Sequence, residues 1–247
     1  MRQISNTMQT LFGFDSLPHI AHAVATVGSY DGVHLGHQVL IEQVVQRAKL
    51  RGGESVVLTF EPHPRITLGQ DDGLKLLTTV EEKRMILESL GVDYMLIIPF
   101  DKAFSRLSHE QFISDYLISK LHIEELVVGY NHHFGYNKGG DYNFLATQGL
   151  EVTRIAQQLV ENNKVSSTVI RATIESGDMG AANQLLGHTY IIIGKSDNNG
   201  FIATDRYKLL PPAGCYRAII DGVESEICVE EGGIRCSMIN RQITIEL

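Results

Sequence analysis

Two histidines near the start of the chain stand three residues apart, where a predicted strand gives way to a predicted helix. His34 and His37 lie in residues 27–37, which read VGSYDGVHLGH. Residues three apart at a helix start face the same way, and the helix amino terminus offers unpaired N–H groups and a positive dipole end. Two imidazoles there can donate hydrogen bonds to phosphate oxygens and stabilise the charge of a departing pyrophosphate. The segment therefore predicts a phosphate site with His34 and His37 as catalytic residues.

The glycines of this segment keep the predicted loop free of side chains. Gly28, Gly32 and Gly36 allow the backbone to approach a ligand closely. Two other interpretations stay open. The histidines could be surface residues that cap a helix, or they could be a metal pair, although a third ligand at metal-site spacing is missing.

A second segment, residues 165–171, reads VSSTVIR and gathers hydroxyl groups and an arginine around a predicted helix start. Ser166, Ser167 and Thr168 suit phosphate oxygens at such a position. Arg171, one turn into the helix, can reach the same anion with its rigid guanidinium fork. A Ser-Ser-Thr run is also a common helix cap, so this segment alone predicts either a cap or a phosphate site.

The elements that position these segments follow from the hydrophobic pattern. Apolar runs predict strands, and apolar residues at helical spacing predict helices. The expected strands are residues 23–27, 55–60, 94–98 and 126–128, and the expected helices are residues 39–50, 81–90, 108–121, 168–176 and 178–186. Ser108 and Gln111 form a capping box for the third of these helices. Apolar strands with helices between them indicate an α/β, Rossmann-like domain with a parallel sheet, which binds ligands at the carboxyl ends of its strands.

The pattern changes after residue 187, where short alternating strands and turn pairs begin. Asp221-Gly222 predicts a two-residue hairpin turn between strands at residues 217–220 and 223–229. We therefore expect two domains. Residues 1–187 would form the α/β domain, and residues 188–247 would form a small β, barrel-like module that packs on a larger neighbour.

Charge and composition narrow the class of protein. The net charge is −8, and no long cluster of lysine and arginine offsets it, which argues against a nucleic-acid partner. No apolar stretch is long enough for a signal peptide or a membrane span, and no obligate protein partner is evident. Cys215, Cys228 and Cys236 are odd in number and lack metal-knuckle spacing. We expect free thiols and a cytoplasmic protein.

The two phosphate segments together resemble those of a known family. Gly-x-x-Asp-Gly-x-His-x-Gly-His, residues 28–37, is similar to the signature of nucleotidyltransferases whose histidines contact ATP phosphates. With residues 166–171 as a second phosphate clamp, the chain resembles bacterial FAD synthetase, the adenylyltransferase half of the bifunctional riboflavin kinase/FAD synthetase family. Further similar stretches are residues 58–64, 100–112, 127–141 and 182–190.

The resemblance implies transfer of AMP from ATP to FMN, which yields FAD and pyrophosphate. It implies ATP and FMN as substrates and Mg²⁺ bridging the phosphates, with no protein side chain assigned as a metal ligand. His34, His37 and Arg171 would be catalytic. The implied ATP-binding residues are Gly28, Tyr30, Asp31, Gly32, Gly36, Ser166, Ser167 and Thr168. Asn131 and His63 would lie near the flavin, although a purely structural turn explains His63 equally well.

Two departures from the family pattern affect these expectations. His132-His133 stands where the family usually has an aromatic residue and often an arginine. The Gly-Phe-Pro-Thr-Ala-Asn stretch of the family's kinase domain is missing, and the β module is about half the usual length. We therefore expect no riboflavin kinase activity. Two alternatives are a flavin- or nucleotide-binding protein with weak or no turnover, and a nucleotidyltransferase that acts on another phosphate acceptor.

Overall fold

The computed structural model describes residues 7–130, 142–147, 149–156, 159–160 and 163–247. Contacts between Cα atoms divide the chain into two compact units. Unit 1 comprises Met1–Tyr30, His37–Asp72 and Ile86–Gln157, and unit 2 comprises Asp31–Gly36, Gly73–Met85 and Gln158–Leu247. The expected boundary at residue 187 stays a prediction, because this grouping joins two earlier stretches to the carboxyl-terminal part of the chain.

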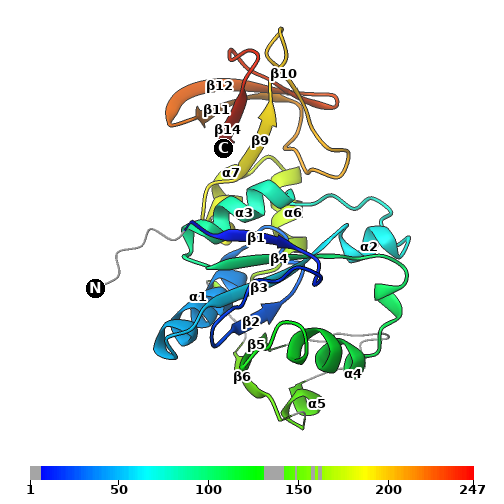
Figure 1. The fold of residues 1–247 in the computed structure, drawn as a ribbon. Helices are drawn as coiled ribbons and strands as arrows, with labels where there is room; N and C mark the ends of the chain where they lie inside the picture. Colours follow the sequence, from blue (N-terminus) through cyan, green and yellow to red (C-terminus); the bar gives the residue numbers. More distant parts are fainter. Residues whose placement is uncertain (1–6, 131–141, 148, 157–158, 161–162) are drawn as a thin grey trace. The chain divides into compact units, whose positions relative to one another are not determined.

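Unit 1 contains a six-stranded sheet in the order β1-β4-β3-β2-β5-β6, in which every neighbouring pair is parallel (Figure 1). The strands are β1 Gln9–Phe12, β2 Val24–Val27, β3 Ser55–Glu61, β4 Tyr94–Pro99, β5 Glu125–Gly129 and β6 Glu151–Ile155. The four expected strands and the parallel sheet are confirmed. The two edge strands, β1 and β6, escaped prediction because neither has a buried apolar run.

The order of the strands reverses at β2. The chain passes from β2 through β3 to β4 on one side of the sheet, and then continues with β5 and β6 on the other side. Thr26 on β2 donates its hydroxyl to the carbonyl of Val127 on β5, at 2.7 Å. Ligands of open α/β sheets bind beyond the carboxyl ends of the strands at such a reversal. Gly28 directly follows β2, so the predicted phosphate loop begins at this edge.

Among the described residues of unit 1, the helix expected at residues 39–50 is confirmed, the helix expected at residues 108–121 differs, and three short helices were not predicted. In α1, Leu35–Leu50, the buried residues Leu40, Ile41, Val44, Val45 and Ala48 form one apolar face. Ser108 and Gln111 make the expected capping box, but α4 is only His109–Gln111 and continues as a π-helix, η2, over Phe112–Ile118. The remaining elements are α2 Pro64–Thr67, η1 Phe104–Arg106 and α5 Tyr142–Ala146, while α3, Val80–Ser89, is shared between the two units.

Unit 2 contains a second six-stranded sheet, in the order β10-β13-β12-β11-β14-β9, in which all pairs are antiparallel (Figure 1). Its strands are β9 Ile191–Lys195, β10 Phe201–Ala203, β11 Gly214–Ile220, β12 Val223–Glu230, β13 Gly233–Arg235 and β14 Gln242–Glu246. The edge strands β9 and β10 also contact each other, which makes the sheet a nearly closed barrel. The short pair β7 Leu159–Val160 and β8 Asn163–Lys164 and the helices α6 Ser167–Glu175 and α7 Met179–Leu186 precede it.

The expected Asp221-Gly222 hairpin is confirmed. It joins β11 to β12, and both turn residues have positive φ angles of 49° and 83°. The register of this hairpin places Cys215 opposite Cys228, and the two form a disulfide. The expectation of free thiols was therefore wrong for these two cysteines, because their spacing along the chain hides their pairing across the hairpin. Cys236 is a buried free thiol.

Candidate phosphate-binding site

The start of the first phosphate segment, in unit 1, is organised around the ring of Tyr30. The Tyr30 hydroxyl lies 2.6 Å from the Thr26 hydroxyl. A Cβ atom on Gly28 would lie 2.9 Å from Cζ of Tyr30, so a side chain at position 28 would displace the ring. The ring also meets the His37 imidazole edge to face, with centroids 5.2 Å apart. In this structure Tyr30, predicted as an ATP contact, supports the position of His37 in the first turn of α1.

The next residue, Asp31, is a buried hydrogen-bonding centre of unit 2. Its Oδ1 accepts hydrogen bonds from the backbone N–H groups of Leu77 and Thr78, at 2.8 and 3.1 Å. Its Oδ2 accepts from Nη2 of Arg171. The backbone carbonyl of Asp31 accepts from the Ser167 hydroxyl at 2.9 Å. Asp31 therefore joins the first phosphate segment to the second within one unit.

Arg171 donates hydrogen bonds to two acceptors, and part of its guanidinium group remains exposed to solvent. Its Nε donates to the carbonyl of Lys75, and its Nη2 donates to Asp31. An arginine has five N–H donors, so these contacts among the described residues use two of them. Because the side chain is 18% exposed, the rest of the fork can donate to an anion from outside.

The amino terminus of α6 carries the three predicted hydroxyl residues in three different settings. Ser166 is the N-cap, and its hydroxyl oxygen accepts from the Val169 N–H. The Ser167 hydroxyl donates to the Asp31 carbonyl, whereas Thr168 is exposed in the first turn of the helix. The segment is thus both a helix cap and an open helix amino terminus, where N–H groups and the dipole favour an anion.

His34 lies in unit 2, buried to 6% exposure close to Asp31 and His188. Burial lowers the pKa of His34 from 6.5 to about 4, and His188 acts in the same direction, while a backbone hydrogen bond and Asp31 oppose the shift. A Cβ on Gly36 would lie 3.3 Å from Cε1 of His34, so Gly36 makes room for the imidazole. His34 is therefore neutral at pH 7, and a neutral imidazole donates one hydrogen bond.

This pKa predicts how stability depends on pH. Below pH 6.5 the unfolded chain protonates His34, but the folded chain does so only near pH 4, so acidification favours unfolding. From pH 7 to pH 5, His34 should remove about 2 kcal/mol of unfolding free energy. Urea unfolding of His34→Gln should lack this part of the decrease, whereas a substitution of the exposed His19 by Gln should retain it. An equal pH dependence in the native protein and His34→Gln would contradict the assignment.

The loop of Gly32 is fixed from two sides. Gly32 has a φ of 83°, and a Cβ there would meet Cδ1 of Leu77 at 2.6 Å. Its N–H donates to the Thr78 hydroxyl at 3.0 Å, and its carbonyl lies 2.9 Å from Nε2 of His188. Val33 next to it also has a positive φ, 40°. Such backbone occurs where the surroundings enforce it, often at ligand sites.

A buried ion pair supports the segment that holds Asp31. Lys208 donates from Nζ to Glu82 at 2.7 Å, to the Leu77 carbonyl at 2.8 Å and to the Ile191 carbonyl at 2.9 Å. Its three protons are thus satisfied, and the ammonium lies over the ring of Tyr190. Lys208 comes from the loop that follows β10, so the β module supports the backbone of residues 77–78 that binds Asp31.

Two predicted site residues remain, His63 of unit 1 and Asn131. His63 is half-buried in unit 1 and caps α2, with Nδ1 accepting from the Arg65 N–H at 3.3 Å. Asn131 and the pair His132-His133 lie outside the described residues. Among the described residues, the grouping of His, Cys, Asp and Glu with metal-binding proximity is Cys215, Glu226 and Cys228. None of the described helices is long and apolar enough to cross a membrane.

Sequence reasoning missed the residues that hold Asp31 and Arg171 in place. One local signal was available: Thr79 and Glu82 form a Thr-x-x-Glu capping box at the start of α3, with reciprocal hydrogen bonds of 2.7 and 3.3 Å. Lys208 and His188 had no such signal, because their partners are far away in the chain.

The parallel sheet with its reversal of strand order, and the glycine loop that follows β2, define an α/β protein with a Rossmann-like fold. The model of the FAD synthetase family matches residues 17–169, more than half of the chain. The chain therefore belongs to the FAD synthetase family.

Two curated relatives are similar to the chain in sequence, and one solved structure is similar to it in fold. The chain is 40% identical over 171 residues to the bifunctional riboflavin kinase/FMN adenylyltransferase of Listeria monocytogenes, covering 68% of this chain and 54% of that protein. It is 33% identical over 226 residues to the Bacillus subtilis protein of the same name, covering 84% and 71%. The crystal structure of a macrolide-efflux protein from Streptococcus pneumoniae shares the fold, with a TM-score of 0.83, 21% identity and coverage of 97% and 89%. The chain spans about half the length of the Listeria and Escherichia coli proteins.

Proposed function

We propose that this protein transfers AMP from ATP to FMN, producing FAD and pyrophosphate, and that it has no riboflavin kinase activity. One observation carries the proposal: Asp31 binds both Arg171 and the backbone of residues 77–78, and so joins the two phosphate segments in one unit. The names of the relatives supply the acceptor, FMN, and the donor, an adenylyl group.

The reaction is an in-line displacement at phosphorus. An oxygen of the FMN phosphate forms a bond to the α-phosphorus of ATP, and the bond from that phosphorus to the bridging oxygen of pyrophosphate breaks. The protein contributes positioning and charge stabilisation, with no covalent enzyme intermediate.

The site residues have separate roles in this proposal. The exposed part of the Arg171 fork and the amino terminus of α6, with Ser166 and Thr168, bind phosphate oxygens. His37 donates a hydrogen bond to the charge that develops on pyrophosphate. Neutral His34 donates without changing its protonation state near pH 7.

The remaining predicted site residues position the phosphate loop or lie at the flavin end of the proposed site. Gly28, Gly32 and Gly36 keep the loop open, Asp31 and Ser167 hold it to α6, and Asn131 and His63 stay predictions for the flavin end. Mg²⁺, bound through the ATP phosphates, would neutralise part of their charge, and the anion-binding donors described above fit a metal–triphosphate complex.

The absence of kinase activity is supported by the sequence of the β module. Its strands β9 and β10 are joined by residues 196–200, so the Gly-Phe-Pro-Thr-Ala-Asn stretch has no counterpart there. The module's described contacts with residues 75–82 give it a supporting role instead. A cytoplasmic location and the absence of nucleic-acid or obligate protein partners stay predictions.

Purified protein incubated with ATP, Mg²⁺ and FMN should form FAD and pyrophosphate, measured by chromatography with fluorescence detection. The same protein with riboflavin and ATP should form no FMN. ATP binding without turnover would favour a nucleotide- or flavin-binding protein, and AMP transfer only to another phosphate compound would change the acceptor. FMN formation from riboflavin would contradict the second half of the proposal.

His37→Ala should lower kcat/KM for FAD formation about 100-fold, because it removes one donor to developing charge. His19→Gln is the control: it changes an exposed histidine outside both phosphate segments, so activity should stay within a few-fold. Full activity in His37→Ala would remove this residue from the proposed mechanism.

A further inference from the structure

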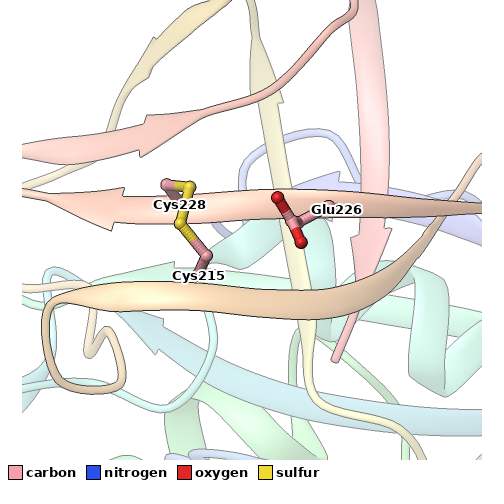
Figure 2. Close-up of side chains that lie close together, drawn as sticks. All are labelled: Cys215, Glu226 and Cys228. Carbon is pink, nitrogen blue, oxygen red and sulfur yellow. A yellow bond between two sulfur atoms is a disulfide. The ribbon is translucent and has the colours of Figure 1, made fainter.

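One face of the β11–β12 hairpin carries the two disulfide-bonded cysteines and a carboxylate. Cys215 pairs with Cys228 across the two strands, and Arg217 pairs with Glu226 two residues further along. Figure 2 shows Glu226 on the same face as the two sulfur atoms and next to them. Cys215, Arg217 and Glu226 are exposed, and Cys228 is half-buried, so small solutes can reach this face.

The hairpin does not depend on the disulfide for its shape. Seven residue pairs register β11 against β12, and each strand also pairs with a second neighbour, β14 or β13. Backbone hydrogen bonds of this ladder close the same 13-residue separation that the disulfide closes. After reduction, the two cysteine side chains therefore still face each other.

We propose that the reduced Cys215–Cys228 pair, together with Glu226, binds a thiophilic divalent cation such as Zn²⁺. The ligand atoms of the three residues lie within 4.8 Å of one another. Zn²⁺ takes sulfur at about 2.3 Å and carboxylate oxygen at about 2.0–2.2 Å, so tetrahedral ligands are roughly 3.5–3.8 Å apart. The two sulfurs must separate by about 2 Å from their bonded positions, which side-chain rotation on opposed strand residues can supply.

A dithiol reductant supplies the electrons and protons that convert the disulfide into two thiols. The reductant gives two electrons and two protons to the disulfide, becomes a disulfide itself and leaves two protein thiols. The cation then displaces both thiol protons to solvent and forms two metal–sulfur bonds. Two thiolates, one carboxylate and Zn²⁺ sum to a charge of −1, which the neighbouring Arg217 offsets.

Three protein ligands leave a fourth position for water. Structural zinc sites are closed by four protein ligands, so this site should exchange its metal readily. Oxidation to the disulfide should expel the metal, because neither sulfur can then serve as a thiolate. The site rests on the β11–β12 hairpin alone and is independent of the proposed FAD synthesis.

Co²⁺ titration of the whole protein tests this proposal. After reduction by a dithiol and removal of the reductant under argon, one equivalent of Co²⁺ should give a thiolate-to-cobalt charge-transfer band, and Zn²⁺ should displace it. The disulfide form should give no band. Cys236→Ser, which changes the buried third cysteine, should retain the band, and Cys228→Ser should lose it.

Glu226→Gln leaves both cysteines in place and should weaken Co²⁺ binding by about tenfold or more. Circular dichroism of each reduced protein confirms that the β module is folded. A folded, fully reduced protein with no charge-transfer band would overturn the proposal, as would a band of equal strength in Cys228→Ser. Unchanged affinity in Glu226→Gln would remove the carboxylate from the site.

Discussion

Arg171→Lys should lower kcat/KM for FAD formation about 100-fold while the protein remains folded. Lysine keeps the positive charge beside Asp31, so the buried carboxylate retains a cationic partner. It lacks the planar fork that donates at once to Asp31, to Lys75 and to an incoming phosphate. Losing one well-placed donor to transition-state charge costs about 10²–10³ in rate.

The variant Asp31→Asn tests how far the orientation of Arg171 by Asp31 matters, apart from the contact of Arg171 itself with the substrate. The amide oxygen can still accept from the N–H groups of Leu77 and Thr78, but the charge that orients Arg171 is gone. We expect a higher KM for ATP with a smaller change in kcat than in Arg171→Lys. Steady-state kinetics in ATP at saturating FMN measure both constants. For the other variant, Arg171→Lys, a kcat/KM equal to that of the native protein would show that the guanidinium fork makes no contact with substrate.

Lys208→Met should lower the free energy of unfolding by about 3–5 kcal/mol. Burial lowers the pKa of Lys208, while the Glu82 carboxylate opposes that shift. Removing the lysine leaves a carboxylate with a fully buried side chain without its cationic partner, and this is the strongly destabilising half of a buried pair. Urea unfolding followed by circular dichroism measures the effect.

A double variant and a surface variant serve as controls for Lys208. Adding Glu82→Gln to Lys208→Met removes the uncompensated charge and should recover part of the lost stability, since the amide oxygen can still accept from one of the two N–H groups, Thr79 or Ile193, that the carboxylate binds. Lys195→Met, on the exposed end of β9, should change stability by less than about 0.5 kcal/mol. A Lys208→Met variant as stable as Lys195→Met would show that the ion pair contributes nothing.

The sequence predicted those parts of the fold that repeat a local pattern. Apolar runs predict the strands β2 to β5, and helical spacing of apolar residues predicts the helix α1. The residue pair Asp221-Gly222 predicts the hairpin turn. No such pattern predicts the edge strand β6, because its side chains are exposed or half-buried. The π-helix at Phe112–Ile118 has the same apolar spacing as an α-helix over so few residues, so its different hydrogen bonding was hidden.

The sequence indicated candidate residues for the site but not the contacts among them. Helix starts and glycines pointed to His34, His37 and the segment that contains Arg171, whose roles stay predictions. Asp31 was expected to contact ATP, yet its carboxylate accepts from residues 46, 47 and 140 positions away in the chain. No pattern in one sequence encodes contacts at such separations. The disulfide joins residues only 13 positions apart, and it was missed because the strand expected at residues 217–220 stops short of Cys215.

The interleaved composition of unit 2 has a consequence for the timing of synthesis. The loop Asp31–Gly36 leaves the ribosome early, but Arg171 follows Asp31 by 140 positions and Lys208 comes later still. At roughly 5–20 residues per second, Arg171 is synthesised on the order of 10 s after the loop. A nascent chain therefore cannot assemble the Asp31–Arg171 anchor until Arg171 has been translated, and nucleotide binding should begin only after that point.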